Sequence, residues 1–173
     1  YLNHKKGIDL LIQAMYSFPE YEFHVAGSFQ DPHLEYYALN SWAEMSNVWF
    51  HGWIDNKDEW LEEVDYLISP SIVESFGYSI AEAMVKGIKP LVHHRPGAIW
   101  PQTWRTMDDL ELMIDPHSEY NSQAYRDHIV NNYSLEKQMS MTMDLVQSLL
   151  AHKQQRGPHL EFAQEVVCPK IDI

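Results

Sequence analysis

The chain has 173 residues, a length that predicts one domain or slightly more, with a core large enough to fold without disulfides. Hydrophobic residues make up 45% of it, aromatic residues 13% and charged residues 21%, which is typical of a globular protein and excludes a disordered or low-complexity one. The formal net charge of -13 excludes nucleic acid and anionic membrane surfaces as partners of the whole chain.

Cysteine use and hydropathy bear on the compartment. Cys168 is the single cysteine, which excludes an internal disulfide and a cysteine-based zinc site and favours a reducing compartment. No stretch approaches the ~18 apolar residues of a membrane-spanning helix, and the first residues lack the layout of a signal peptide. We therefore expect a cytoplasmic protein with no direct membrane span.

The first half of the chain alternates helical and strand-like segments. Apolar residues spaced three and four apart predict helices, and short apolar runs bounded by turn residues predict strands. In chain order these are a helix at 7–18, a strand at 22–26 that stops at Gly27, a helix at 33–45, a strand at 47–50, a helix at 56–64, a strand at 65–69, a helix from Ser75 or Gly77 to Lys86, and a strand at 88–93. This alternation predicts a doubly wound, Rossmann-like, mostly parallel α/β sheet flanked by helices.

The second half is predominantly helical. Helical spacing predicts helices at 106–113, 119–133 and 134–153, and the periodicity fades after Gly157. We expect a Rossmann-like domain over residues 1–153 and a tail over 154–173. A doubly wound sheet normally opens with a strand, whereas Tyr1 comes directly before the first helix, so we expect this sequence to start partway through that strand, as a fragment would.

Two acidic residues occupy the segment that follows the strand at 65–69. Glu74 precedes a Phe-Gly pair, and Glu82 lies eight residues further on, inside the next helix. In doubly wound sheets, ligands bind beyond the carboxyl ends of the strands, near helix amino termini that favour anions, and Gly77 lets the backbone approach a ligand closely. Carboxylates accept hydrogen bonds from vicinal hydroxyls, so the two acids predict a site for a sugar or a ribose.

Structural explanations of the same acids stay open at this point. Ser79 and Glu82 have the Ser-x-x-Glu spacing of a capping box, so Glu82 is also explained by a helix start. Glu74 is also explained as a loop acid stabilised by the helix dipole.

Several motifs together resemble one enzyme family. The stretch from Pro70 to Val92 resembles the PS-x-x-E-x-FG-x-x-x-x-EAM-x-x-G-x-PVV block of retaining GT-B glycosyltransferases, specifically family 4. The stretch 6–14 resembles that family's KG-hydrophobic-LL-x-A helix, and the stretches 25–27 and 48–53 resemble its VGxG and V-x-F-x-G elements, in the same order and spacing. The resemblance covers residues 1–100 clearly and the later helices loosely.

The resemblance implies that the chain is the carboxyl-terminal, donor-binding half of a GT-B enzyme. Such an enzyme transfers a hexose from a nucleotide-diphosphate sugar to an acceptor hydroxyl with retention, in polysaccharide or glycoconjugate biosynthesis. The implied partner is the acceptor-binding N-terminal domain of the same protein, without which the half is expected to be inactive. Neither a metal nor a cofactor is expected, in keeping with the metal-independent habit of GT-B enzymes and with the lack of a convincing Asp-x-Asp motif.

The resemblance also implies roles for individual residues. In it Glu74 contacts hydroxyls of the donor sugar, Glu82 contacts the ribose, and Lys6 pairs with the diphosphate. The backbone at the remaining positions meets the donor: Phe76, Gly77, Tyr78, Gly27 and Gly97. The residues alone favour the interpretation of Lys6 as a solvated lysine beside Lys5.

Two departures from the family pattern bear on function. The arginine that the family carries ahead of the KG motif falls on Tyr1, and the GG-x-x-E stretch is replaced by residues 95–100, which keep Gly97 and begin with Arg95. Arg95 either supplies the missing charge or is an exposed loop residue. These departures motivate an alternative function, a non-catalytic GT-B-like binding or regulatory module; a nucleotide-sugar epimerase of the same architecture fits the Glu74 block less well.

Other side chains suggest weaker hypotheses. His93 and His94, together with His51, invite a metal site, but adjacent strand residues point to opposite faces, so we expect one of the pair to line the donor pocket instead. The tryptophans are expected in the core or at sheet edges, and the methionines, Met139, Met141 and Met143 among them, as core filling. Neither a Ser-His-Asp arrangement nor a Walker lysine motif is present.

Overall fold

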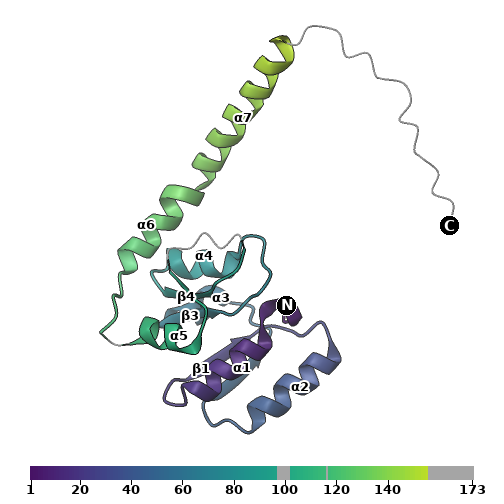
Figure 1. The fold of residues 1–173 in the computed structure, drawn as a ribbon, viewed down its shortest axis with the longest axis vertical. Coiled ribbons are helices and arrows are strands. Elements are labelled where there is room, and N and C mark those ends of the chain that lie inside the picture. Colours follow the sequence, from purple (N-terminus) through teal and green to yellow (C-terminus); the bar gives the residue numbers. More distant parts are fainter. Residues whose placement is uncertain (97–101, 116, 156–173) are drawn as a thin grey trace, which may run out of the picture. The chain divides into compact units, whose positions relative to one another are not determined.

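The structure, a computed structural model, describes residues 1–96, 102–115 and 117–155 (Figure 1). By its internal contacts the chain divides into two units, Tyr1–Asn132 and Tyr133–Ile173, which are described separately below. The predicted ligand residue Gly97 lies outside the described residues, as does the predicted tail from residue 156 onward.

The first unit contains the alternation of strands and helices that the sequence predicts. Its elements are η1 (His4–Lys6), α1 (Ile8–Ser17), β1 (Phe23–Ala26), α2 (Pro32–Ala43), β2 (Val48–Gly52), α3 (Lys57–Trp60), η2 (Leu61–Glu63), β3 (Tyr66–Ser69), α4 (Tyr78–Val85), β4 (Lys89–His93), β5 (Thr103–Trp104), α5 (Met107–Ile114) and α6 (Ser122–Tyr133). The differences are small: the helix expected at 56–64 is a short α-helix followed by a 3-10 turn, and β5, only two residues long, gave no periodic signal.

The strands pair in parallel, as predicted, but the structure divides the expected sheet in two. β1 pairs with β2, and β3, β4 and β5 form a second sheet in that order. The segment before α1 lies between the two: Leu2 bridges Phe29 in parallel, and the carbonyl of Lys5 accepts a hydrogen bond from the backbone of Ile72. Residues 2–5 therefore connect the loops that follow β1 and β3.

Helix α1 joins the cores of both sheets. One part of its apolar stripe, including Ile8, Leu11 and Met15, packs with β1 and α2, and another part, including Ala14, packs with Leu91 of β4. Figure 1 shows α1 and α2 beside β1, and α4 beside β3 and β4. Burying one large aliphatic side chain is worth about 1.5–3 kcal/mol, so this shared helix is a principal link between the two halves of the unit.

Two buried polar side chains hold helix ends in place. The Nδ2 atom of Asn47 donates hydrogen bonds to the carbonyls of Met15, Phe18 and Tyr21, where α1 ends. Lys89, 2% exposed, donates from Nζ to the carbonyl of Met113 at 2.7 Å, near the end of α5. Each side chain satisfies carbonyls that a helix leaves unpaired at its carboxyl end.

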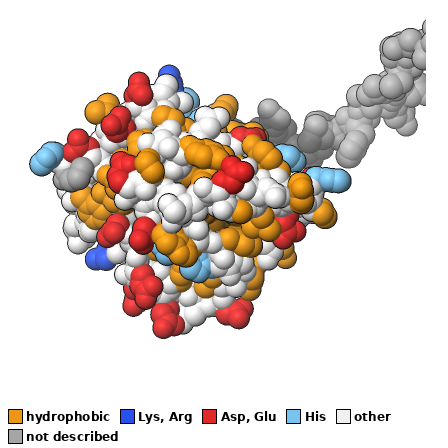
Figure 2. Space-filling model, turned by 90° about the horizontal axis from the view of Figure 1, so that it is seen from below, with side chains coloured by type: hydrophobic (Ala, Val, Ile, Leu, Met, Phe, Trp, Pro, Cys, Tyr) orange, Lys and Arg blue, Asp and Glu red, His pale blue; other side chains and the backbone are white. Residues whose placement is uncertain are grey.

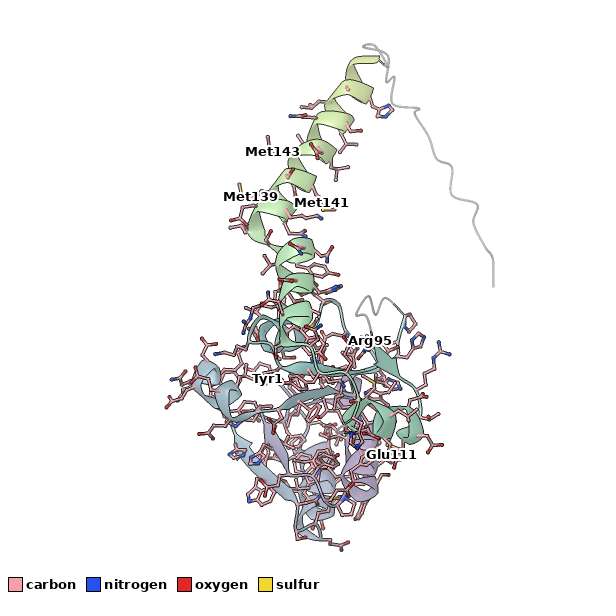
Figure 3. The ribbon with its side chains drawn as sticks, turned by 90° about the vertical axis from the view of Figure 1, so that its left-hand side faces the viewer. Tyr1, Arg95, Glu111, Met139, Met141 and Met143 are labelled. Carbon is pink, nitrogen blue, oxygen red and sulfur yellow. The ribbon has the colours of Figure 1, made fainter. Side chains whose placement is uncertain are left out.

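The second unit contains α7 (Leu135–Gln155), which covers most of the predicted helix at 134–153. Its methionines Met139, Met141 and Met143 are 59%, 56% and 57% exposed, so the expectation that they fill a core is wrong (Figure 3). Helical spacing reveals an apolar stripe but not what covers it. Among the described helices, none is both long and apolar enough to span a membrane.

Candidate functional site

The site is built where the backbone before α1 meets the loop after β3. Gly7 ends η1 and begins α1 in the left-handed conformation, with φ of 68°. A Cβ atom there would lie 2.1 Å from the carbonyl oxygen of Pro70. Only glycine lets the two segments approach this closely. The glycine of the KG motif therefore serves the approach of Lys6 to the loop.

Backbone hydrogen bonds fix this approach. The carbonyl of Lys5 accepts hydrogen bonds from the backbone N–H groups of Ile72, at 2.9 Å, and Val73, at 3.3 Å. Two motifs that are far apart in the sequence are thereby joined one residue away from Lys6 and from Glu74. The side chains of these two residues are brought together by backbone contacts and not by their own attraction alone.

Lys6 and Glu74 form an ion pair, with Nζ of Lys6 donating to Oε2 of Glu74. The Glu74 side chain is 17% exposed and that of Lys6 is 36% exposed. Burial raises the pKa of Glu74, but the hydrogen bond and charge of Lys6, a backbone hydrogen bond from Ser75 and the charge of Arg95 outweigh it, so the pKa lies below its usual value. Glu74 is therefore ionised at neutral pH, and Lys6 is not simply a solvated lysine.

The amino end of α4 lies directly after this pair. Gly77 is the N-cap, with φ of 84°, and it provides no side-chain capping hydrogen bond. Because the helix begins at Tyr78, Ser79 is already helical, so the capping-box explanation of Glu82 is wrong. The rings of Phe76 and Tyr78 meet edge-on at 5.1 Å, and Tyr78 is 74% exposed. The first turn of α4 is thus without the side-chain cap that commonly satisfies its N–H groups.

Glu82 has a different partner from Glu74. Its Oε2 atom lies 2.6 Å from Nζ of Lys57 on α3, and both side chains are substantially exposed, at 40% and 52%. Sequence reasoning missed this pair because no local pattern relates α3 to α4. Each of the two predicted ligand acids is thus held by its own lysine in the described part of the chain.

Arg95, labelled in Figure 3, lies just past the carboxyl end of β4. It is buried, at 5% exposure, so its interpretation as an exposed loop residue is wrong. Its Nη1 atom lies 3.4 Å from the carbonyl of His93. Its Nη2 atom lies 3.6 Å from where a Cβ of Gly77 would stand, and the Cγ of Glu74 lies 3.5 Å from the same point. Burial lowers the pKa of Arg95, and the charge of Glu74 opposes this. Arg95 therefore belongs to the same cluster as Glu74.

Cations are scarce in the chain as a whole. The whole chain has 12 Lys plus Arg against 25 Asp plus Glu. Figure 2 shows acidic and hydrophobic side chains spread over one face, with few lysines or arginines among them. A small anion would meet a repulsive surface over much of the molecule, and Lys6 and Arg95 create a local exception.

Gly27, predicted to meet the donor, and Tyr1, at the place of the family's arginine, have surroundings other than the Lys6–Glu74 pair. Gly27, at the end of β1, donates from its backbone to the carbonyl of Gly52 at 2.6 Å and packs against Leu2. The ring of Tyr1, at the place of the family's arginine, lies 6.0 Å from the ring of Trp53.

The three histidines considered for a metal have separate surroundings. His51 lies beside His24, with Nε2 and Nδ1 2.9 Å apart. His94 contacts Arg105 at 3.1 Å. His93 packs edge-on against Trp104 at 4.7 Å. Within the described ranges, no group of three or more His, Cys, Asp or Glu residues could hold a metal ion.

Two hollows of about 590 and 480 Å³ lie on other parts of the first unit. The larger is lined by residues including Lys89, Arg105 and Glu119, and the smaller by residues including Lys86 and Arg126. Neither is lined by Lys6, Glu74 or Arg95. The cluster is chemically the more distinctive place because it combines a partly buried acid, two cations and a helix start without a side-chain cap.

Comparison with known proteins adds a family and a fold. The model of the family described as glycosyl transferases group 1 matches residues 1–130. No curated protein matches the chain.

Solved structures share the fold, among them the following three. The crystal structure of TarM is 20% identical, with a TM-score of 0.66 over 82% of this chain and 32% of that one. A mutant of S. aureus TarM in complex with Fondaparinux, alpha-GlcNAc-glycerol and UDP is 20% identical, with a TM-score of 0.63 over 82% of this chain and 33% of that one. The pneumococcal O-GlcNAc transferase GtfA in complex with UDP and GlcNAc is 19% identical, with a TM-score of 0.55 over 86% of this chain and 34% of that one. The chain thus spans about one third of the length of each structure, and it shares the α/β, Rossmann-like architecture of GT-B glycosyltransferases.

Proposed function

This chain belongs to the glycosyl transferases group 1 family, and from that premise we propose that it is the donor-binding half of a retaining glycosyltransferase of family 4. In this proposal a hexose passes from a nucleotide-diphosphate sugar to an acceptor hydroxyl. The acceptor is bound by an N-terminal domain of the same protein. We place the reaction in cytoplasmic polysaccharide or glycoconjugate biosynthesis.

The observation that carries the proposal is the Lys6–Glu74 ion pair at the uncapped start of α4. A diphosphate needs a cation and N–H donors, and the sugar attached to it needs an acceptor for its hydroxyls. Lys6, the first turn of α4 and Glu74 supply these three functions side by side. This combination is more specific than a helix start or an acidic loop alone.

Each residue has a defined task in the proposal. Lys6 and the backbone amides of Phe76, Gly77 and Tyr78 bind the diphosphate and the adjoining sugar, while Glu74 accepts hydrogen bonds from sugar hydroxyls. Glu82 accepts hydrogen bonds from the ribose. Gly27 and Gly97 allow the backbone to approach the donor.

The chemistry proposed for this half is electrostatic. When the bond between the anomeric carbon and the diphosphate oxygen breaks, negative charge accumulates on the departing diphosphate. Lys6 and the N–H groups of α4 stabilise that charge, and no metal or cofactor is invoked. Glu74 holds the sugar in a fixed orientation while the acceptor oxygen forms the new bond to the anomeric carbon and its proton passes to the departing diphosphate.

Donor binding tests the proposal directly. UDP and a UDP-hexose are the first ligands to titrate by calorimetry, because UDP occurs in the TarM and GtfA complexes, followed by GDP- and ADP-hexoses. Lys6→Met should weaken binding at least about tenfold, the loss of one charge-assisted hydrogen bond. Lys5→Met is the matched control, since it removes the same charge one residue away. A folded wild-type chain that binds none of these ligands would contradict the proposal.

A non-catalytic binding module is the second candidate. The tyrosine at the place of the family's arginine favours it, because the Tyr1 side chain, which lies beside Trp53, supplies no positive charge to a diphosphate. Donor hydrolysis discriminates between the two. A protein that contains both halves, binds a nucleotide sugar and neither transfers nor hydrolyses it would favour the module.

A further inference from the structure

The cluster contains one cation that the proposed function leaves without a task. Arg95 is 5% exposed, and burying a guanidinium is unfavourable unless a counter-charge lies near it. In the part of the chain that the structure describes, the guanidinium of Arg95 makes one long hydrogen bond, to the carbonyl of His93. Glu74 is the acid whose charge acts on the guanidinium. The counter-charge of Arg95 is therefore Glu74.

Arg95 and Glu74 lie against the same point of the backbone. A Cβ atom on Gly77 would be 3.6 Å from Nη2 of Arg95 and 3.5 Å from Cγ of Glu74. Both side chains thus border the space that the missing Cβ leaves at the start of α4. The charges of Arg95 and Glu74 act on each other across this point, although Lys6 makes the direct ion pair with Glu74.

The two cations differ in their freedom to move. The Lys6 side chain is 36% exposed and reaches Glu74 through a flexible stem, whereas Arg95 is enclosed. A diphosphate that arrives at the start of α4 offers Lys6 two negative charges in place of one. When Lys6 turns to the diphosphate, Glu74 loses its direct partner inside a partly buried site, and that loss is costly unless another cation compensates.

We propose that Arg95 is a positioning residue that takes over as the counter-charge of Glu74 when the donor diphosphate draws Lys6 away. This inference rests on the proposed function, because it assumes that Lys6 binds the diphosphate. Glu74 then stays a carboxylate aimed at the sugar hydroxyls through the exchange. Arg95 acts through Glu74 and makes no contact with the sugar itself.

The first experiment asks whether Arg95 acts through Glu74 or directly on the diphosphate. Because the diphosphate draws Lys6 away in both ligands, Arg95→Gln should weaken binding of UDP and of a UDP-hexose about tenfold or more. In a Glu74→Gln background, where no carboxylate needs a counter-charge, the same substitution should weaken either ligand less than about threefold. An equal loss in both backgrounds would place Arg95 on the diphosphate and overturn the proposal, and so would no loss in the wild-type background. If Arg95→Gln does not fold, Arg95→Lys replaces it: this variant keeps the charge and should retain the wild-type affinity for both ligands, and a tenfold loss would overturn the role of the charge.

The second experiment needs no donor. Lys6→Met mimics the departure of Lys6, and the titration of Glu74 is followed by the carboxyl ¹³C chemical shift. The groups that face Glu74 are Lys6 before α1 and Arg95 after β4, with His93 beside Arg95. Glu74 should titrate at lower pH in Lys6→Met than in Lys6→Met with Arg95→Gln, and His93→Gln in the same background should not reproduce the difference. Equal titration in the two variants would overturn the proposal.

The two experiments also separate failure of this inference from failure of the proposed function. If the wild-type chain binds no nucleotide sugar, the proposed function fails, while the Glu74 titration still decides whether Arg95 is its second counter-charge. If the donor binds and Arg95→Gln weakens it equally in the wild-type and Glu74→Gln backgrounds, the proposed function stands and this inference fails.

Discussion

Glu82 of α4 and Lys57 of α3 form an ion pair in which the Oε2 and Nζ atoms lie 2.6 Å apart. The two side chains are 40% and 52% exposed, so solvent screens the pair. Such a pair contributes little to stability but competes with any ligand hydroxyl that approaches Glu82. It is therefore better tested by binding than by unfolding.

If Glu82 binds the ribose, replacing Glu82 and replacing its partner Lys57 should have opposite effects on the affinity for UDP. Glu82→Gln should weaken UDP about tenfold because a charge-assisted hydrogen bond is lost. Lys57→Ala should leave the affinity for UDP unchanged or improve it, since it frees Glu82. Both variants should lose less than about 1 kcal/mol of unfolding free energy. A tenfold loss of UDP affinity in Lys57→Ala would instead show that the lysine itself contacts the nucleotide.

Gly7 is expected to be essential for the local fold. In Gly7→Ala the new Cβ would lie 2.1 Å from the carbonyl oxygen of Pro70, with the backbone at a φ of 68° that L side chains rarely adopt. Gly52→Ala is a matched control, because its φ is 67° and nothing lies within 4 Å of the added Cβ.

The two glycine variants differ only in the steric clash. We expect Gly52→Ala to cost ~1 kcal/mol from the backbone alone, and Gly7→Ala to cost at least ~2 kcal/mol more. Urea denaturation measures both. Equal costs would mean that the segment before α1 moves away from Pro70 without difficulty, and the tight approach of Lys6 to the loop would lose its basis.

The sequence predicted the elements well because local patterns encode them. The apolar spacing within Ile8–Ser17 and the short runs that became β1 and β4 follow from periodicity and from the glycines and prolines around them. The motif at Pro70–Val92 located the loop before α4 because Glu74, Gly77 and Glu82 have the same spacing in the sequence as the matching residues of the family motif. These features depend on neighbours within one or two turns of chain.

Contacts between distant segments were the part that sequence reasoning could not supply. Nothing near Arg95 in the sequence indicates that it is buried beside Glu74, and nothing in α4 indicates that Glu82 pairs with Lys57. Strand β5 was missed because two residues give no periodicity, although Trp104 within it is fully buried. Side-chain partners across the fold depend on tertiary packing and not on local propensity.

Acid should weaken the Lys6–Glu74 pair. Burial raises the pKa of Glu74, but Lys6, the backbone of Ser75 and Arg95 together place it below the usual value, so the folded state prefers the ionised form. The unfolded state then binds more protons as pH falls, and the contribution of the pair, present above the ordinary carboxyl pKa, is lost below it.

Comparing Glu74→Gln with wild type isolates this contribution. The difference in unfolding free energy should be largest near pH 7 and should shrink between about pH 5 and pH 3, around the ordinary glutamate pKa. Glu111→Gln, at an exposed position on α5, is the control (Figure 3). A difference that stays constant over this range would mean that the charge of Glu74 adds nothing to stability.

His93 should make the fold sensitive to pH in a higher range. Burial lowers its pKa, and the charges of His94 and Arg95 act in the same direction, while a hydrogen bond with the backbone of Ser71 opposes them. The folded state therefore prefers the neutral imidazole. Below the ordinary histidine pKa of about 6.5 the unfolded state takes up a proton that the folded state resists, so stability falls as pH decreases.

Replacing His93 by Gln should remove that slope. The wild-type unfolding free energy should decrease from pH 7 to pH 5.5, and His93→Gln should show a weaker decrease over the same range, whatever its stability at pH 7. His94→Gln is the matched control, because His94 is the adjacent residue but contacts Thr103 and Arg105 instead. Thermal unfolding across this pH range measures all three proteins. If His93→Gln and wild type lose stability in parallel, another group is responsible, and the burial of His93 against Trp104 has no consequence for its charge.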